Sequence, residues 1–137
     1  MRRILFILAI VGFFSCKNRI HKERTTTLNS WEQIKTAVIK NNIAFLIENS
    51  TDTLNCIECN NGNNKIAKKL FYNEHFNQMD VIKNKEYSFF TKDINNSKFN
   101  KKHKISYIIN DKETMVYELL ENTNTNKVIF LGVISIP

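Results

Sequence analysis

Val-Ile-Phe-Leu-Gly-Val-Ile-Ser-Ile, residues 128–136, is an almost unbroken apolar run near the end of the sequence. Isoleucine and valine dominate it, and β-branched side chains favour the extended conformation, so we expect a strand here. Because apolar residues occupy both of its faces, this strand is expected to lie centrally in a sheet or to be covered on both sides. Gly132 interrupts the run, which predicts a bulge or the close approach of another backbone.

Shorter stretches upstream of this run also have the composition of strands, and polar turns separate them. The expected strands cover residues 87–91, 105–109 and 115–120, and the expected turns cover residues 110–113 and 122–126. Short turns join neighbouring strands that run in opposite directions. These segments and the final run therefore predict an antiparallel meander of three to four strands.

The half of the chain before these strands has apolar residues at helical spacing. Spacings of three and four residues predict one helix over residues 30–48, with Ser30 and Gln33 placed to form a capping box, and a second helix over 64–80. The polar residues 50–63 are expected to form the loop between the two helices. Two helices followed by antiparallel strands predict an α+β fold in which both helices pack on one face of a curved sheet.

This order of elements, together with the apolar end of the chain, resembles the cystatin-like architecture of nuclear-transport-factor-2-like domains over residues 29–137. The resemblance implies a curved sheet wrapped on a long helix. Enzymes with this architecture place paired acids, or an acid with Tyr or His, inside the cone of the sheet. Tyr107 and Tyr117 are candidates to face inward, but Glu118 is expected to point away from Tyr117 because strand side chains alternate.

The first residues have the form of a secretory signal peptide. Arg2 and Arg3 precede an uncharged apolar run over residues 4–14. A helix of that length spans only about half of a ~30 Å hydrocarbon core, so the run is too short for a stable transmembrane helix. A basic start followed by a short apolar stretch is typical of exported proteins, and we expect residues 1–15 to be removed on export.

The apolar run ends directly at a cysteine. Phe13-Phe14-Ser15-Cys16 resembles the lipobox of Bacteroidetes-type bacterial lipoproteins, although the two phenylalanines replace the usual leucine and small residue. The resemblance implies cleavage before Cys16 and a lipid bonded to its thiol, and two or three acyl chains make such attachment effectively permanent. Residues 16–28 are then expected to form a lipidated N-terminus and polar tether ahead of a single domain, residues 29–137. A soluble secreted protein and an uncleaved membrane anchor are the alternatives.

The residues after Cys16 bear on the location of the protein. Position 17 is Lys rather than the Asp that retains many lipoproteins in the inner membrane, and no acidic pair follows the cysteine. These resemblances imply an outer-membrane lipoprotein that faces the periplasm, with exposure at the cell surface as the alternative. The membrane, reached through the lipid anchor, is therefore an expected partner.

The basic charge of the chain raises the question of nucleic acid. Removing residues 1–15 takes away two arginines and no acid, which leaves 18 basic side chains against 13 acidic ones and a net charge of +5. Because exported proteins seldom meet nucleic acid, we expect no nucleic-acid partner despite this charge. The most basic stretch, residues 98–104, is expected to be a solvated loop, with contact to an acidic partner or a lipid headgroup as the alternative.

Cys56 and Cys59 form a C-x-x-C pair in a chain that is expected to enter an oxidising compartment. We predict a structural disulfide between them. A redox site and a zinc site are the alternatives, although the flanking residues do not resemble a thioredoxin motif and the histidines lack ligand spacing. No metal and no cofactor are expected. Asp52-Thr53-Leu54 matches a short O-glycosylation signal of exported Bacteroidetes proteins, which makes Thr53 a candidate modification site.

The sequence contains no G-x-S-x-G or H-E-x-x-H motif and no phosphate-cradling glycine loop. The leading hypothesis is therefore a non-enzymatic, lipid-anchored module of the envelope that binds an unidentified ligand or envelope protein. An immunity-type inhibitor of an envelope toxin is the second hypothesis. A small enzyme with its site in the cone of the sheet is the third. His75 is a candidate base in that third case, and otherwise it is expected to be a surface or half-buried residue of helix 64–80.

Overall fold

The computed structural model describes residues 17–56, 59 and 64–137, with side chains from Thr27 onward. The helices are α1 (Lys17–Ile39), α2 (Ile43–Glu48), α3 (Lys68–Glu74) and the 3-10 helix η1 (Phe76–Ile82). The strands are β1 (Ser50–Cys56), β2 (Lys65–Ala67), β3 (Ser88–Asp93), β4 (Lys101–Asn110), β5 (Glu113–Asn122) and β6 (Lys127–Ile136). The α+β class predicted from the sequence is confirmed.

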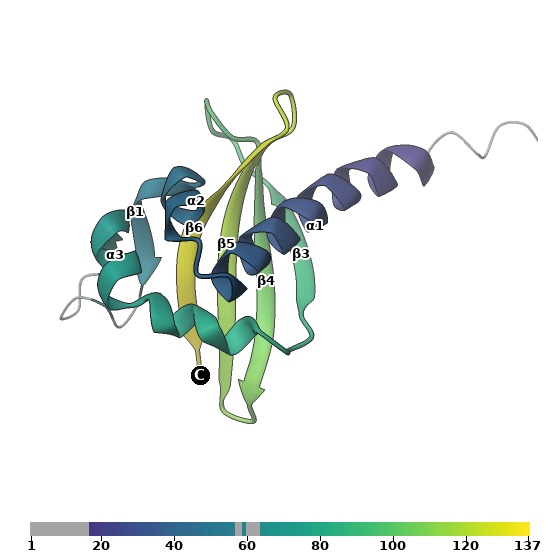
Figure 1. Ribbon diagram of the computed structural model, residues 1–137. Coiled ribbons are helices and arrows are strands. Elements are labelled where there is room, and N and C mark those ends of the chain that lie inside the picture. Colours follow the sequence, from purple (N-terminus) through teal and green to yellow (C-terminus); the bar gives the residue numbers. More distant parts are fainter. Residues whose placement is uncertain (1–16, 57–58, 60–63) are drawn as a thin grey trace, which may run out of the picture.

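The six strands of the described chain form one mixed sheet in the order β2-β1-β6-β5-β4-β3 (Figure 1). Strands β3 to β6 make the predicted antiparallel meander, and β6 is an interior strand, as its apolar composition predicts. On the other side of β6, β1 pairs with it in parallel, and β2 then pairs antiparallel with β1. The prediction of a purely antiparallel, cystatin-like sheet of three to four strands was therefore wrong.

The two additional strands lie in segments for which the sequence predicts other structure. The polar composition of residues 50–63 predicts a loop, yet Ser50–Cys56 forms β1 because β6 supplies backbone partners for it. Within the predicted helix 64–80, Lys65–Ala67 instead pairs with β1, and the helical remainder divides into α3 and η1. Both segments are strands because residues far away in the sequence pair with them. The local pattern of apolar and polar residues carries no information about such partners.

The predicted helix over residues 30–48 is two helices. α1 ends at Ile39, and Asn41 has a φ of 53°, a left-handed conformation that asparagine tolerates better than most residues. Asn42 then caps α2, because its Oδ1 accepts a hydrogen bond of 3.2 Å from the Phe45 N–H. α1 also extends farther toward the N-terminus than the sequence predicts, because residues 17–28, expected to be a polar tether, are helical.

The helices pack on one face of the sheet. In Figure 1, α1 crosses this face and its first turns project beyond the edge formed by β3, while η1 crosses the same face farther down. Buried side chains from every described helix join side chains of the sheet in one core, which includes Trp31, Leu46, Phe71 and Met79. The inner face of the sheet is therefore the packed interior of the domain.

Gly132 explains how β1 can lie beside β6. Its φ is +141°, and a Cβ atom built on it would lie 2.3 Å from the backbone oxygen of Asn55 on β1. The pairing of β5 with β6 also shifts register at this point, between Glu118 and Leu119. The bulge and the close backbone approach predicted at Gly132 are both confirmed.

Gly132→Ala is expected to lower the free energy of unfolding by about 2–3 kcal/mol, because the new methyl group meets backbone atoms of β1 and the residue must keep a strained φ. Urea unfolding followed by circular dichroism measures this. Ser106→Ala on β4 is the control. It removes a single hydroxyl group and is expected to change the free energy of unfolding by less than about 0.5 kcal/mol. Equal stability of the two variants would contradict the proposed close approach.

Candidate functional site

The position that the resemblance assigns to an active-site cone is filled by aromatic side chains. Trp31 is fully buried, and its Nε1–H donates a hydrogen bond of 3.1 Å to the Tyr107 hydroxyl. The Tyr117 ring lies 5.3 Å from the indole, and its hydroxyl donates to the backbone oxygen of Gln78. Burial raises the pKa of both tyrosines above their ordinary value, so both phenols remain protonated, the Tyr107 hydroxyl as an acceptor from Trp31 and the Tyr117 hydroxyl as a donor to Gln78. Tyr107 and Tyr117 do face inward, as the sequence predicts.

Glu118 lies on the opposite face of the sheet from Tyr117, as the alternation of strand side chains predicts. Its Oε1 is 2.6 Å from the Lys102 Nζ, and its Oε2 accepts a hydrogen bond from the Asn55 Nδ2 at 3.1 Å. The side chain is almost completely buried by these neighbours. Glu118 therefore joins β1, β4 and β5 on the outer face and is not placed beside the inward-facing tyrosines.

The inner face contains an acid beside a histidine that the sequence analysis did not identify. His103 and Glu121 are each 2% exposed, and His103 Nε2 lies 2.6 Å from Glu121 Oε2. The Thr27 hydroxyl of α1 donates to the same carboxylate oxygen at 2.8 Å. On the other side of the imidazole, Nδ1 lies 2.9 Å from the Thr91 hydroxyl of β3. This buried network connects α1 with three strands of the sheet.

The network corrects the assignment of residues 98–104 as a solvated loop, because β4 begins at Lys101 and His103 is buried. Burial by itself raises the pKa of Glu121, but the hydrogen bonds from His103 and Thr27, and the charges of His103 and Lys101, outweigh it. The pKa of this carboxyl therefore lies below its ordinary value. A period-two pattern indicated the position, since His103 lies on the same strand face as the inward-facing Ile105 and Tyr107.

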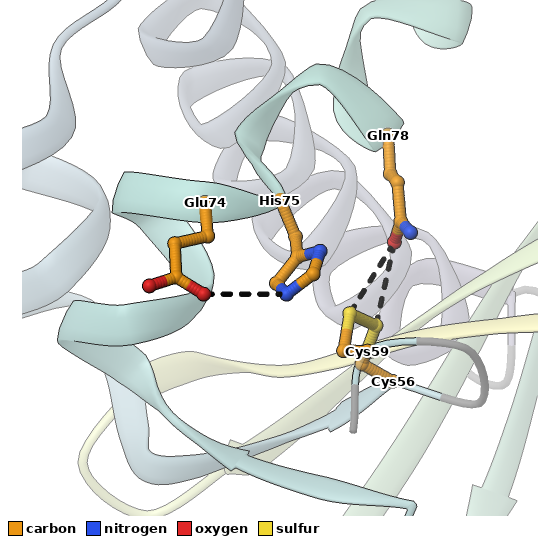
Figure 2. Close-up of a disulfide and its surroundings, with 5 residues drawn as sticks. All are labelled: Cys56, Cys59, Glu74, His75 and Gln78. Carbon is orange, nitrogen blue, oxygen red and sulfur yellow. Dashed lines mark hydrogen bonds and ion pairs between the residues drawn. A yellow bond between two sulfur atoms is a disulfide. The ribbon is translucent and has the colours of Figure 1, made fainter. Parts of the chain in front are cut away.

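The C-x-x-C pair lies where β1 ends. Cys56 and Cys59 are at disulfide distance, with Cα atoms 5.4 Å apart, in agreement with the predicted bond (Figure 2). Cys56 is 2% exposed, whereas Cys59 is half-buried. Gln78 Oε1 of η1 lies 3.3 Å from the Cys56 Sγ and 3.7 Å from the Cys59 Sγ. One amide oxygen therefore contacts both sulfur atoms.

His75 lies at the junction of α3 and η1, near this pair (Figure 2). Its Nε2 is 3.9 Å from the Glu74 carboxylate, and its side chain is 24% exposed. The prediction of a half-buried histidine is confirmed. The prediction that His75 lies within one continuous helix was wrong. α3 ends at Glu74, and His75 is the N-cap of η1.

A cavity of about 200 Å³ lies between η1 and the sheet and shares residues with the disulfide site. Gln78 lines it, and so does Val133, which is the β6 register partner of Cys56. The other walls are mainly apolar, with the Glu113–Ser135 hydrogen bond of 3.1 Å as a polar element. The cavity is lined by Gln78, Val81, Ile109, Glu113, Met115, Val133 and Ser135.

Two predicted modification sites remain, Thr53 and Cys16. Thr53 is exposed, but on strand β1 rather than in a loop, and the neighbouring Asp52 carboxylate is 3.1 Å from the Lys68 Nζ. Cys16 and the signal segment lie outside the described residues. Within the part of the chain that the structure describes, no helix is long and apolar enough to cross a membrane, and no group of His, Cys, Asp or Glu side chains is suited to hold a metal ion.

Comparisons with known proteins do not assign this chain to a family: no family model, no curated protein and no solved structure matches it. The function is therefore inferred from the arrangement of the side chains.

Proposed function

We propose that this protein is a lipid-anchored protein of the bacterial envelope whose α+β domain binds a ligand or protein partner without catalysing a reaction. Cys16 carries the lipid, and the domain lies on the periplasmic side of the outer membrane. The proposal combines the apolar run that ends at Cys16 with the way in which the folded domain begins.

The observation that supports the proposal is that the chain is already helical at Lys17, where the described residues begin, and stays helical into the folded domain. Farther along α1, Thr27 donates a hydrogen bond to Glu121, and Trp31 enters the core. The helical residues 17–26 are about 15 Å long, and this segment lies between the proposed lipid attachment and the first buried contact, at Thr27.

Two features of the domain support a binding role. The inner face, where the resemblance implies a catalytic site, is occupied by the packed Trp31, Tyr107 and Tyr117 side chains. A groove of about 400 Å³ lies on the surface at α1 and the start of α2. Most of its lining side chains are polar, and Phe45 adds one aromatic ring, so it offers hydrogen-bonding groups and one apolar contact to a partner. The groove is lined by Asn29, Glu32, Gln33, Thr36, Ala37, Lys40, Asn42 and Phe45.

Cys16→Ala is expected to abolish incorporation of lipid, because no other cysteine follows the apolar run directly. Cells that express the full-length protein are fed a labelled fatty acid, and the protein is isolated and measured for label. Label is expected in the wild type and absent from Cys16→Ala.

Cys56→Ala combined with Cys59→Ala is the matched control, since it removes two thiols and keeps the proposed attachment site. This variant is expected to take up as much label as the wild type. Label that persists in Cys16→Ala, or a wild-type protein of unmodified mass at residue 16, would refute the lipid anchor.

A further inference from the structure

The Cys56–Cys59 pair differs from an ordinary buried structural disulfide in its surroundings. It closes a very short loop, and the entropic stabilisation from a disulfide decreases as the loop becomes shorter. Cys59 is half-buried as a residue, whereas Cys56 is buried, so Cys59 is the more exposed member of the pair. An asymmetry of this kind directs an attacking thiol to one sulfur.

Gln78 is placed to stabilise the reduced form of the pair. A disulfide has no hydrogen to donate, whereas each thiol of a reduced pair can donate its S–H to an oxygen. Gln78 Oε1 lies 3.3 Å from the Cys56 Sγ and 3.7 Å from the Cys59 Sγ (Figure 2). The backbone of Gln78 is also held in place, because its oxygen accepts from the Tyr117 hydroxyl and its N–H donates to the backbone oxygen of His75.

A cavity of about 200 Å³ lies next to the residues that contact the pair. It is lined by Gln78 and by Val133, the register partner of Cys56, although neither cysteine is among its lining residues. It can hold part of a thiol substrate that contacts Gln78, with apolar surface from Val81 and Met115.

We propose that, beside the binding role, Cys56 and Cys59 form a thiol–disulfide exchange site that oxidises low-molecular-weight thiols or a partner's cysteine once, stoichiometrically and without turnover, with Gln78 as a positioning residue. A substrate thiolate attacks the Cys59 sulfur and forms a mixed disulfide. The Cys56–Cys59 bond breaks, its electron pair goes to the Cys56 sulfur, and this sulfur takes up the proton that the substrate released. A second substrate thiol then displaces Cys59 as a thiol, so two thiols become one disulfide and two cysteines are reduced.

The test uses the purified full chain in detergent, equilibrated with defined mixtures of reduced and oxidised glutathione. Alkylation and peptide mass spectrometry report the redox state of Cys56 and Cys59. We expect the pair to be reduced by glutathione while circular dichroism shows the fold intact. We expect Gln78→Leu to shift the exchange constant about fivefold toward the disulfide, since one hydrogen bond to the thiols is lost.

Gln78→Glu keeps an oxygen at the same distance along the side chain and is expected to restore most of the wild-type constant. Gln78→Asn shortens the side chain by one methylene group and so moves the amide oxygen away from the sulfur atoms. Like Gln78→Leu, it is expected to shift the exchange constant toward the disulfide. Asn84→Leu, which replaces an exposed amide in the turn after η1, is the control for the change to leucine and is expected to match the wild type. Val81→Phe, which narrows the cavity, is expected to slow reduction by glutathione several-fold.

Two results would overturn the proposal. The first is a pair that glutathione reduces only in denaturant, which would leave a purely structural disulfide. The second is an exchange constant that is unchanged in both Gln78→Leu and Gln78→Asn. Because the measurement does not depend on residue 16, the lipid anchor and the exchange site succeed or fail separately.

Discussion

Glu121→Ala is expected to lower the free energy of unfolding by about 3–5 kcal/mol, because it removes the carboxylate that accepts hydrogen bonds from two buried side chains. The substitution removes the carboxylate oxygen to which the His103 Nε2–H and the Thr27 hydroxyl donate, at a site that is buried in the folded protein. It also leaves a cavity at the contact between α1 and the sheet. The expected loss corresponds to a fall of roughly 10–25 °C in the unfolding temperature.

Chemical denaturation and thermal unfolding of the wild type and the variant measure this effect. Glu86→Ala is the matched control, because Glu86 is an exposed glutamate outside the network, and its replacement is expected to change stability by less than about 0.5 kcal/mol. Thr27→Val removes only one donor and is expected to cost about 1 kcal/mol. If Glu121→Ala were as mild as Glu86→Ala, the buried network would not be what fixes α1 to the sheet.

The effect of Glu121 also depends on pH. The pKa of its carboxyl is lower in the folded protein than its ordinary value of 4.5, so the folded state favours the charged form. Its contribution is complete at pH values above that ordinary value and is lost as the pH falls through the lower, folded-state value. The stability difference between the wild type and Glu121→Gln is therefore expected to shrink as the medium is acidified below pH 4.5. A difference that stays constant over this range would contradict the assignment.

Trp31→Ala is expected to destabilise the domain by about 3–5 kcal/mol, the usual loss when a large aromatic side chain is removed from a core. The indole is fully buried and contacts the rings of Tyr87, Tyr107 and Tyr117. Its removal opens a cavity at the centre of the inner face. It also removes the N–H that the Tyr107 hydroxyl accepts.

Trp31→Phe separates these two contributions, because it keeps an aromatic ring in the core and loses only the N–H donor and part of the volume. It is expected to cost about 1–2 kcal/mol. Circular dichroism is the appropriate probe, since Trp31 is the only tryptophan and its fluorescence disappears in both variants. Nearly equal losses in the two variants would mean that the hydrogen bond to Tyr107, rather than packing, dominates.

The C-terminal half of the fold was predictable because its information is local. The apolar run 128–136 and the polar turns at 110–113 and 122–126 determine where strands begin, end and reverse, and β4, β5 and β6 follow that plan with extended ends. The role of Gly132 was also predictable, because a glycine inside an apolar strand usually marks a bulge or a close backbone contact. The disulfide pairing followed from the short spacing of Cys56 and Cys59 and is present at the expected distance.

The candidate sites were less predictable because their parts come from distant segments. Gln78 contacts the cysteines only because α3 and η1 bring it back across the end of β1. Histidine and glutamate are polar, so the sequence predicts solvent exposure for His103 and Glu121. Each is buried only because its polar atoms have hydrogen-bond partners, in the other residue and in Thr27 or Thr91. A sequence pattern contains no record of such mutual satisfaction.

The amino-acid sequence by itself determined the antiparallel meander of the C-terminal half and the α+β class, because side-chain alternation and turn residues act over a few neighbours. The leader that ends at Cys16, together with the proposed anchor, remains a prediction from the sequence. Tertiary structure alone decided that Ser50–Cys56 joins the sheet in parallel with β6 and that Lys65–Ala67 extends it. A strand whose composition is polar forms only when another strand supplies its backbone partners, and that partner lies some eighty positions away in the chain.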